Sequence, residues 1–184
     1  MEDIFWHDYQ TKARSTAIYP RQGKNPLYPM LGLIGEIGEI ANKVKKIMRD
    51  DNDQITPKRR QEIGDEIGDA LWYIANLCYE LHINMDTFAI KNSLKPECIN
   101  LFYEILYVQL PIYKIGATIQ SLHPEKPYFE THKKLKSNIG LILQFLLSVS
   151  IILDLDLREI ATNNIEKLFD RKDRGVLGGS GDER

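Results

Sequence analysis

Four acidic residues recur at a spacing that puts their side chains on one face of each of two helices. The segment "LGLIGEIGEIANK" holds Glu36 and Glu39, and "EIGDEIGDALWY" holds Glu66 and Asp69. Residues three apart lie about 60° apart around a helix axis, so the carboxylates of each pair point to the same side. Like charges this close repel one another. Either they form a solvated acidic face, or a divalent cation lies among them.

The chemistry of the side chains indicates which cation that would be. Carboxylate oxygens are the ligands that Mg²⁺ prefers, and neither motif contains a His or Cys that would favour zinc. A di-iron carboxylate bundle would need Glu-x-x-His pairs, which both motifs lack. Glu62 lies one turn before Glu66 and is expected to help hold a metal or an attacking water. Asp65 is expected to face solvent or to pair with Arg59 or Arg60.

The residues around the acids complete a family pattern. The segment "LGLIGEIGEIANKVKKIMRD", followed by "EIGDEIGDALWYIANL", resembles the MazG-like, all-α nucleoside triphosphate pyrophosphohydrolases, which are related to the all-α dimeric dUTPases. Their mark is a Glu-x-x-Glu helix, a spacer, and a Glu-x-x-Asp helix that runs into a hydrophobic and aromatic stretch. The resemblance covers about 30–95 and 160–184. Many members double the first acid of the first motif, and Gly35 stands at that position here.

The resemblance implies Mg²⁺-dependent hydrolysis of (deoxy)nucleoside triphosphates to monophosphate and pyrophosphate, as in housecleaning of the nucleotide pool. Mn²⁺ could substitute for Mg²⁺. The resemblance also implies that the catalytic metal ligands are Glu36, Glu39, Glu66 and Asp69. Residues expected to bind the substrate are cationic, aromatic or amide side chains: Lys43, Lys46, Tyr73, Asn76, Lys167, Arg171 and Arg174. The alternative is a non-catalytic nucleotide-binding or helical interaction module, against which the retention of all four acids speaks.

These side chains must be positioned by helices, because helical periodicity is strong along the chain and strand signals are weak. We expect an all-α helical bundle with helices over about 3–19, 30–48 and 57–82. Thr56 followed by Pro57 predicts the N-terminus of the third helix. A short helical stretch to about Pro96 should follow, and a long helical region should end near Lys172.

Composition sets limits on the class of protein. The chain has 184 residues, 43% of them hydrophobic, which suits one well-cored domain. A net charge of -2 argues against nucleic-acid or membrane-surface partners, and two cysteines provide no disulfide framework. The N-terminus is too polar for a signal peptide, and the apolar run 139–153 falls short of the roughly 20 residues that span a bilayer. We expect a cytoplasmic protein whose partner is a nucleoside triphosphate, with a homodimer as an open alternative.

An internal similarity relates the two halves of the chain. Residues 67–95 align without a gap to 139–167, at an offset of 72 residues, with seven identities in 29 positions. In this register Glu66 meets Asn138 and Asp69 meets Leu141, so the second half lacks these acids. We predict a duplicated unit in which 1–96 is the acidic copy, 97–175 a degenerate copy and 176–184 a flexible tail. One composite site per chain follows, with metal ligands from the first copy and phosphate contacts from 167–174.

Overall fold

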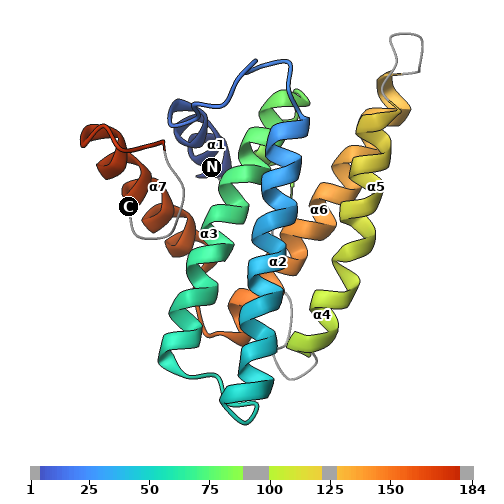
Figure 1. Ribbon diagram of the computed structural model, residues 1–184. Coiled ribbons are helices and arrows are strands. Elements are labelled where there is room, and N and C mark those ends of the chain that lie inside the picture. The colour runs from blue at the N-terminus through green and yellow to red at the C-terminus, as the bar shows by residue number, and fades with distance from the viewer. Residues whose placement is uncertain (1–4, 89–99, 122–127, 179–184) are drawn as a thin grey trace.

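The protein is all-α in the part of the chain that the computed structural model describes, which comprises residues 5–88, 100–121 and 128–178 (Figure 1). The expected all-α class is confirmed. The helices are α1 (Phe5–Ser15), α2 (Leu27–Asp50), α3 (Pro57–Glu80), the 3₁₀ turn η1 (Met85–Thr87), α4 (Leu101–Tyr107), α5 (Gln109–Gln120), α6 (Tyr128–Ile152) and α7 (Leu157–Asp173). The predicted helical stretch over 89–95, the loop at 123–127 and most of the tail lie outside the described residues.

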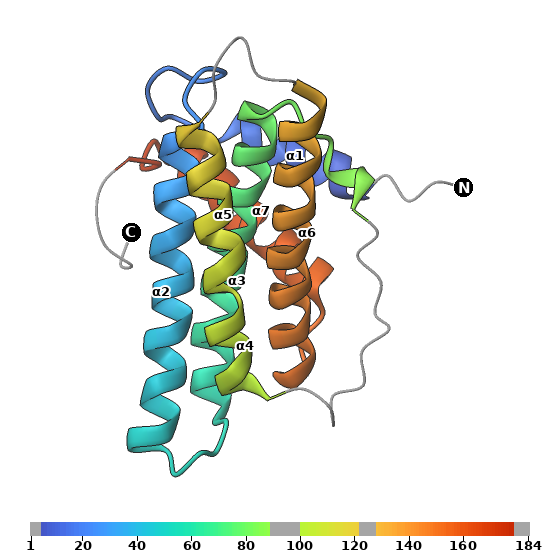
Figure 2. The same cartoon turned by 90° about the vertical axis from the view of Figure 1, so that its right-hand side faces the viewer.

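The long helices form a bundle. Figure 2 shows α2, α3, α5 and α6 side by side, with α2 joined to α3 by a short connection. Apolar side chains along one stripe of α2 and one stripe of α3 are fully buried and form the centre of the core, among them Leu33, Ile37, Ile40, Ile63 and Ile67. Burial of such stripes is the main favourable term for helix pairing. The two helices that carry the acidic motifs are therefore held in direct contact.

Local capping fixes the ends of these helices. Thr56 caps α3 as predicted, because its side chain accepts a hydrogen bond from the backbone N–H of Arg59 and Pro57 occupies the first turn. The long helical region predicted to end near Lys172 consists of two helices, α6 and α7, and ends at Asp173. Asp154 adopts a positive φ of 54°, and the Asp156 side chain then accepts hydrogen bonds from the N–H groups of Arg158 and Glu159 to start α7.

The first helix is shorter than predicted. It ends at Ser15 rather than near Tyr19, and the Thr16 hydroxyl donates to the carbonyl of Ala13 at the end of the helix. Tyr19 lies beyond this end and is buried, with its hydroxyl 2.7 Å from a carboxylate oxygen of Glu80. The connection from α1 to α2 is thus tied to the C-terminal end of α3.

The apolar helix α6 is long enough to be compared with a membrane span. The segment Glu130–Ile152 has 23 residues, so it is longer than the apolar run 139–153, and its most apolar 18-residue window has a mean hydropathy of 1.7. More than half of its apolar window is buried inside the bundle, including Ile139, Ile142 and Leu146. The interpretation of this segment as a core helix agrees with that packing.

The two halves share a local backbone geometry. After α3, His82 has a φ of 53° and the N–H of Ile83 donates to the carbonyl of Cys78. After α6, Asp154 has a φ of 54° and the N–H of Leu155 donates to the carbonyl of Ser150. Both are Schellman-type helix ends. Asn84 and Asp156 follow as caps of the next helical turn. These pairs fall at the offset of 72 residues found in the sequence, and the duplication itself stays a prediction, as do the proposed boundaries of the two copies.

Candidate metal centre

Three of the four predicted ligands converge between α2 and α3. One carboxylate oxygen each from Glu36, Glu66 and Asp69 lies within 4.8 Å of the other two. Ligand oxygens about 2.1 Å from a Mg²⁺ ion stand up to about 4.2 Å apart across it, so only a small closing movement would let all three reach one cation. The spacing and the all-oxygen donor set therefore fit a hard divalent cation.

Glu39 lies at the edge of this cluster. Its side chain is exposed and is not one of the three converging carboxylates. On α2 it follows Glu36 by three residues, which turns it about 60° further round the axis. Its negative charge nevertheless contributes to the raised pKa of Glu36, so it is close enough to act on the same site.

Burial and the neighbouring carboxylates disfavour the ionised form of Glu36 in this cluster. The pKa of Glu36 is raised to about 8, first by burial and then by the charge of Asp69 and a hydrogen bond with Glu66. A proton therefore stays on Glu36 near neutral pH when no cation is bound. This is the behaviour expected of carboxyl groups that share one site.

Two lysines from different helices neutralise the other acids. Lys43 Nζ lies 2.9 Å from Glu66 Oε1, and Lys167 Nζ lies 2.9 Å from Asp69 Oδ1. Although burial alone would lower the pKa of Lys43, the hydrogen bond to Glu66 raises it above its ordinary value. The second contact joins α7 to α3 across 98 positions of sequence. Lys43 and Lys167 were both expected at the site.

Asn164 is a site residue that sequence reasoning did not single out for a role. Its Nδ2 donates to Asp69 Oδ1 at 2.6 Å, while its own Oδ1 is buried without a hydrogen-bond partner. Asn164 and Lys167 thus contact the same oxygen of Asp69. A signal was present, because Asn164 is one of the seven identities in the internal alignment.

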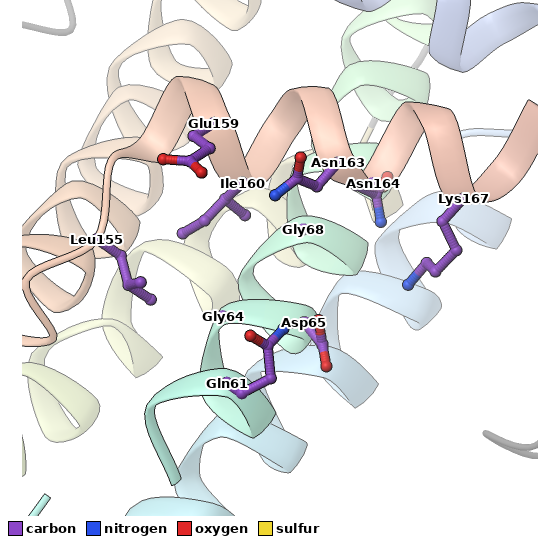
Figure 3. Close-up of a pocket in the computed structure, with 10 residues that line it drawn as sticks. All are labelled: Gln61, Gly64, Asp65, Gly68, Leu155, Glu159, Ile160, Asn163, Asn164 and Lys167. Atoms are coloured by element: carbon purple, nitrogen blue, oxygen red, sulfur yellow. Dashed lines mark hydrogen bonds between the residues drawn. The ribbon is translucent and has the colours of Figure 1, made fainter. Parts of the chain in front are cut away.

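Glycines on α3 allow α7 to come this close. A Cβ added at Gly68 would lie 3.0 Å from Cβ of Asn164, and one added at Gly64 would lie 3.2 Å from the Leu155 side chain. Between the two helices remains a cavity of about 170 Å³ (Figure 3). Its lining is formed by Gln61, Gly64, Asp65, Gly68, Leu155, Glu159, Ile160, Asn163, Asn164 and Lys167. It shares Asn164 and Lys167 with the acidic cluster, so the two regions adjoin.

Glu62 and Lys46 lie apart from the converging carboxylates. Glu62 Oε2 pairs with Arg59 at 2.8 Å, and this hydrogen bond lowers the pKa of Glu62. Its negative charge is thus balanced by a neighbour on the same helix. Lys46 is half-buried and its charge acts on Asp50, one turn further along α2. Asp65 is exposed, in line with the first of its two predicted environments.

Two further α3 side chains predicted to bind substrate are less exposed than a contact residue would suggest. Tyr73 is half-buried, packs edge-on against Trp72, and fills the space where any side chain at position 32 would begin. Gly32 is thus required for this placement. Asn76 is fully buried; its Nδ2 donates to the carbonyl of Trp72 and its Oδ1 has no hydrogen-bond partner.

The C-terminal arginines lie further along α7. Arg171 is half-buried one turn after Lys167, and Arg174 is exposed and paired with Asp170 at 2.7 Å. Of the three cations predicted from this segment, the structure brings Lys167 into contact with the acids.

Comparison with known proteins identifies the family that the chain resembles. The model of the MazG nucleotide pyrophosphohydrolase domain matches residues 24–97, which include all four acids of the two motifs. The "Gene 37 protein" of Mycobacterium phage L5 is 44% identical over 89 residues, spanning 46% of this chain and 78% of that protein. No solved structure matches the chain significantly. With its helical fold and its paired acidic motifs, the chain belongs to the MazG nucleotide pyrophosphohydrolase family.

Proposed function

We propose that this protein hydrolyses (deoxy)nucleoside triphosphates between the α- and β-phosphates, with Mg²⁺ as the cofactor and Mn²⁺ as a substitute. The observation that carries the proposal is the convergence of Glu36, Glu66 and Asp69 within 4.8 Å. Bound there, a divalent cation would neutralise the polyphosphate and lower the pKa of a water molecule. The products would be a nucleoside monophosphate and pyrophosphate, which suits a housecleaning role in the nucleotide pool.

Cation binding, proton acceptance and phosphate binding would fall to different residues of the chain. Glu36, Glu66 and Asp69 hold the cation, and exposed Glu39 beside them is placed to accept the proton of the attacking water. Lys43 and Lys167 balance Glu66 and Asp69 in this structure. When a cation takes over that balance, both ammonium groups become available to phosphate oxygens. Arg171, one turn after Lys167, extends this cationic side toward the leaving pyrophosphate.

The decisive test is pyrophosphate release with Mg²⁺ across a panel of nucleoside triphosphates. Glu66→Gln should lower turnover at least about a hundredfold, because it removes a ligand charge while the helix remains intact. Asp8→Asn is the control, because it removes an exposed carboxylate of α1 that pairs with Lys12, and it should leave turnover near wild type.

Two outcomes would contradict the proposal. Equal turnover in Glu66→Gln and wild type would remove the acids from catalysis. Tight nucleotide binding without pyrophosphate release would favour the alternative, a non-catalytic nucleotide-binding module. We further propose a cytoplasmic protein without nucleic-acid or membrane partners. Sedimentation of the purified chain would decide whether it forms a homodimer.

A further inference from the structure

A second carboxylate of α3, remote from the acidic cluster, is buried at the end of the helix. The Glu80 side chain is 0% exposed. Its Oε1 accepts hydrogen bonds from Arg14 Nη1 at 3.1 Å, the Tyr19 hydroxyl at 2.7 Å and the Gly23 N–H at 2.8 Å. Its Oε2 accepts the Asn25 N–H at 2.7 Å. We call this arrangement the Glu80 clamp.

The donors identify what the Glu80 clamp holds. Apart from Arg14, all of them belong to the connection between α1 and α2, 55 to 61 positions away in sequence. A buried carboxylate is costly unless its oxygens are satisfied, so Glu80 and this connection depend on one another. Although burial would raise the pKa of Glu80, the hydrogen bonds from Asn25, Gly23, Tyr19 and Arg14 lower it. The carboxylate is thus ionised at neutral pH.

A row of aromatic rings connects the clamp to the candidate site. The Tyr19 ring packs edge-on against Trp72 with centroids 6.5 Å apart, and Trp72 packs edge-on against Tyr73 at 5.0 Å. Trp72 is itself fixed, since its Nε1 donates to the carbonyl of Ala13 and to the Thr16 hydroxyl. Trp72 thus contacts both Tyr73 and Tyr19, and Tyr19 belongs to the loop that Glu80 holds in place.

The positions of Asp69, Tyr73 and Glu80 along α3 show which way the row of aromatic rings runs. Asp69, Tyr73 and Glu80 lie on one face of the helix, since 11 residues bring the chain round by about three turns. The rise of about 1.5 Å per residue puts Tyr73 about 6 Å and Glu80 about 16 Å beyond Asp69. A nucleotide whose phosphates lie at the acids can extend its sugar and base along this face toward Tyr73.

We propose that Glu80 is a positioning residue that holds the α1–α2 connection and, through Tyr19 and Trp72, orients Tyr73 at the nucleoside end of the substrate site. This inference rests on the proposed function, because it takes the acidic cluster as the phosphate end. The clamp itself acts without substrate. Its loss should affect recognition of the nucleoside and spare the acidic cluster.

Glu80→Gln tests the clamp. The amide keeps the shape of the carboxylate, but it loses the negative charge opposite Arg14 and presents an NH2 group where one carboxylate oxygen accepted an N–H donor, so the hold on the loop should weaken. Amide hydrogen exchange at Gly23 and Asn25 should accelerate about tenfold or more. In a Trp6→Phe background, Trp72 is the remaining tryptophan, and its emission should shift to the red. KM for the best nucleotide should rise about tenfold with kcat within about threefold, as expected when ground-state binding is lost. Mg²⁺ binding should not change.

Asp8→Asn is the control, since it removes an exposed carboxylate of α1 that pairs only with Lys12 among the described ion pairs. Wild-type exchange and emission in Glu80→Gln would overturn the clamp. A released loop with unchanged KM would overturn its role in nucleoside binding. If Glu80→Gln does not fold, Tyr19→Phe keeps the ring and removes one hydrogen bond, and it must shift exchange and KM in the same direction. Absence of turnover in the wild type would count against the proposed function, while exchange and Trp72 emission would still judge the clamp.

Discussion

Glu36 is the carboxyl group whose ionisation a bound cation would change most. In the folded chain its pKa is raised from 4.5 to about 8, whereas the unfolded chain releases this proton near the ordinary value. Between these two values the folded state holds more protons than the unfolded state. The free energy of unfolding should therefore fall as the pH rises from about 5 to about 8.

Thermal unfolding of the cation-free protein across this range would measure the effect. Tm should decrease with pH in wild type and change much less in Glu36→Gln, because the amide has no proton to lose. Added Mg²⁺ should raise Tm most at the alkaline end, where the cation replaces the missing proton. An identical pH slope in Glu36→Gln would show that another group causes it.

Residue types and spacing were sufficient to pair the acids on each helix, since this pairing follows helical periodicity within single segments. Lys43 and Lys167 were predicted to bind substrate and not as partners of Glu66 and Asp69. Residue types and spacing could not reveal that Asn164 donates to Asp69 or that Glu80 collects the α1–α2 connection. Both contacts cross more than 50 positions of sequence and arise only when separate helices pack. A lone Asn or Glu in a helical pattern carries no local sign of such a partner.

At the scale of the helices, the approach of α7 to α3 decides whether the second half of the chain can serve the site. Gly68 permits this approach and has Asn164 against it, whereas Gly35 on α2 has nothing within 4 Å of where a Cβ would be. Gly35→Ala should raise the free energy of unfolding by about 0.5–1 kcal/mol, since alanine favours the helix. Gly68→Ala should be less stable than Gly35→Ala by about 1–3 kcal/mol through overpacking.

Urea unfolding of both variants would measure this difference. Gly68→Ala should also weaken the contacts that Lys167 and Asn164 make with Asp69, so its turnover should fall while its helical content is kept. Equal stabilisation by both alanines would mean that α7 can retreat from α3 at little cost.

The helix ends illustrate what sequence could and could not indicate about the elements. The Thr56–Pro57 start of α3 was predictable because capping is local. The break at Asp154 was missed, because Asp adopts the left-handed region without the glycine that usually marks such a stop. The internal alignment pairs His82, where the third helix was predicted to end, with Asp154, so carrying that predicted helix end across the offset of 72 residues would have indicated the break.

At the scale of the whole molecule, the two halves contribute different chemistry to one site. The first half supplies Glu36, Glu66 and Asp69, and α7 of the second half supplies Asn164 and Lys167 within the same chain. On the predicted duplication, the degenerate half would take the place of a second subunit. The site should then be complete in each chain whatever its oligomeric state.

Mixing two inactive variants tests this directly. Asp69→Asn lacks a metal ligand and Lys167→Ala lacks the lysine that pairs with it, and each alone should lose most turnover. If each chain builds its own site, the mixed variants, refolded together from denaturant, should show no more pyrophosphate release than the average of the two alone. If α7 instead served a neighbouring chain, a mixed assembly would contain one site with both wild-type residues and would recover up to about a quarter of wild-type activity in a dimer. Such recovery would replace the intrachain site with one shared between subunits.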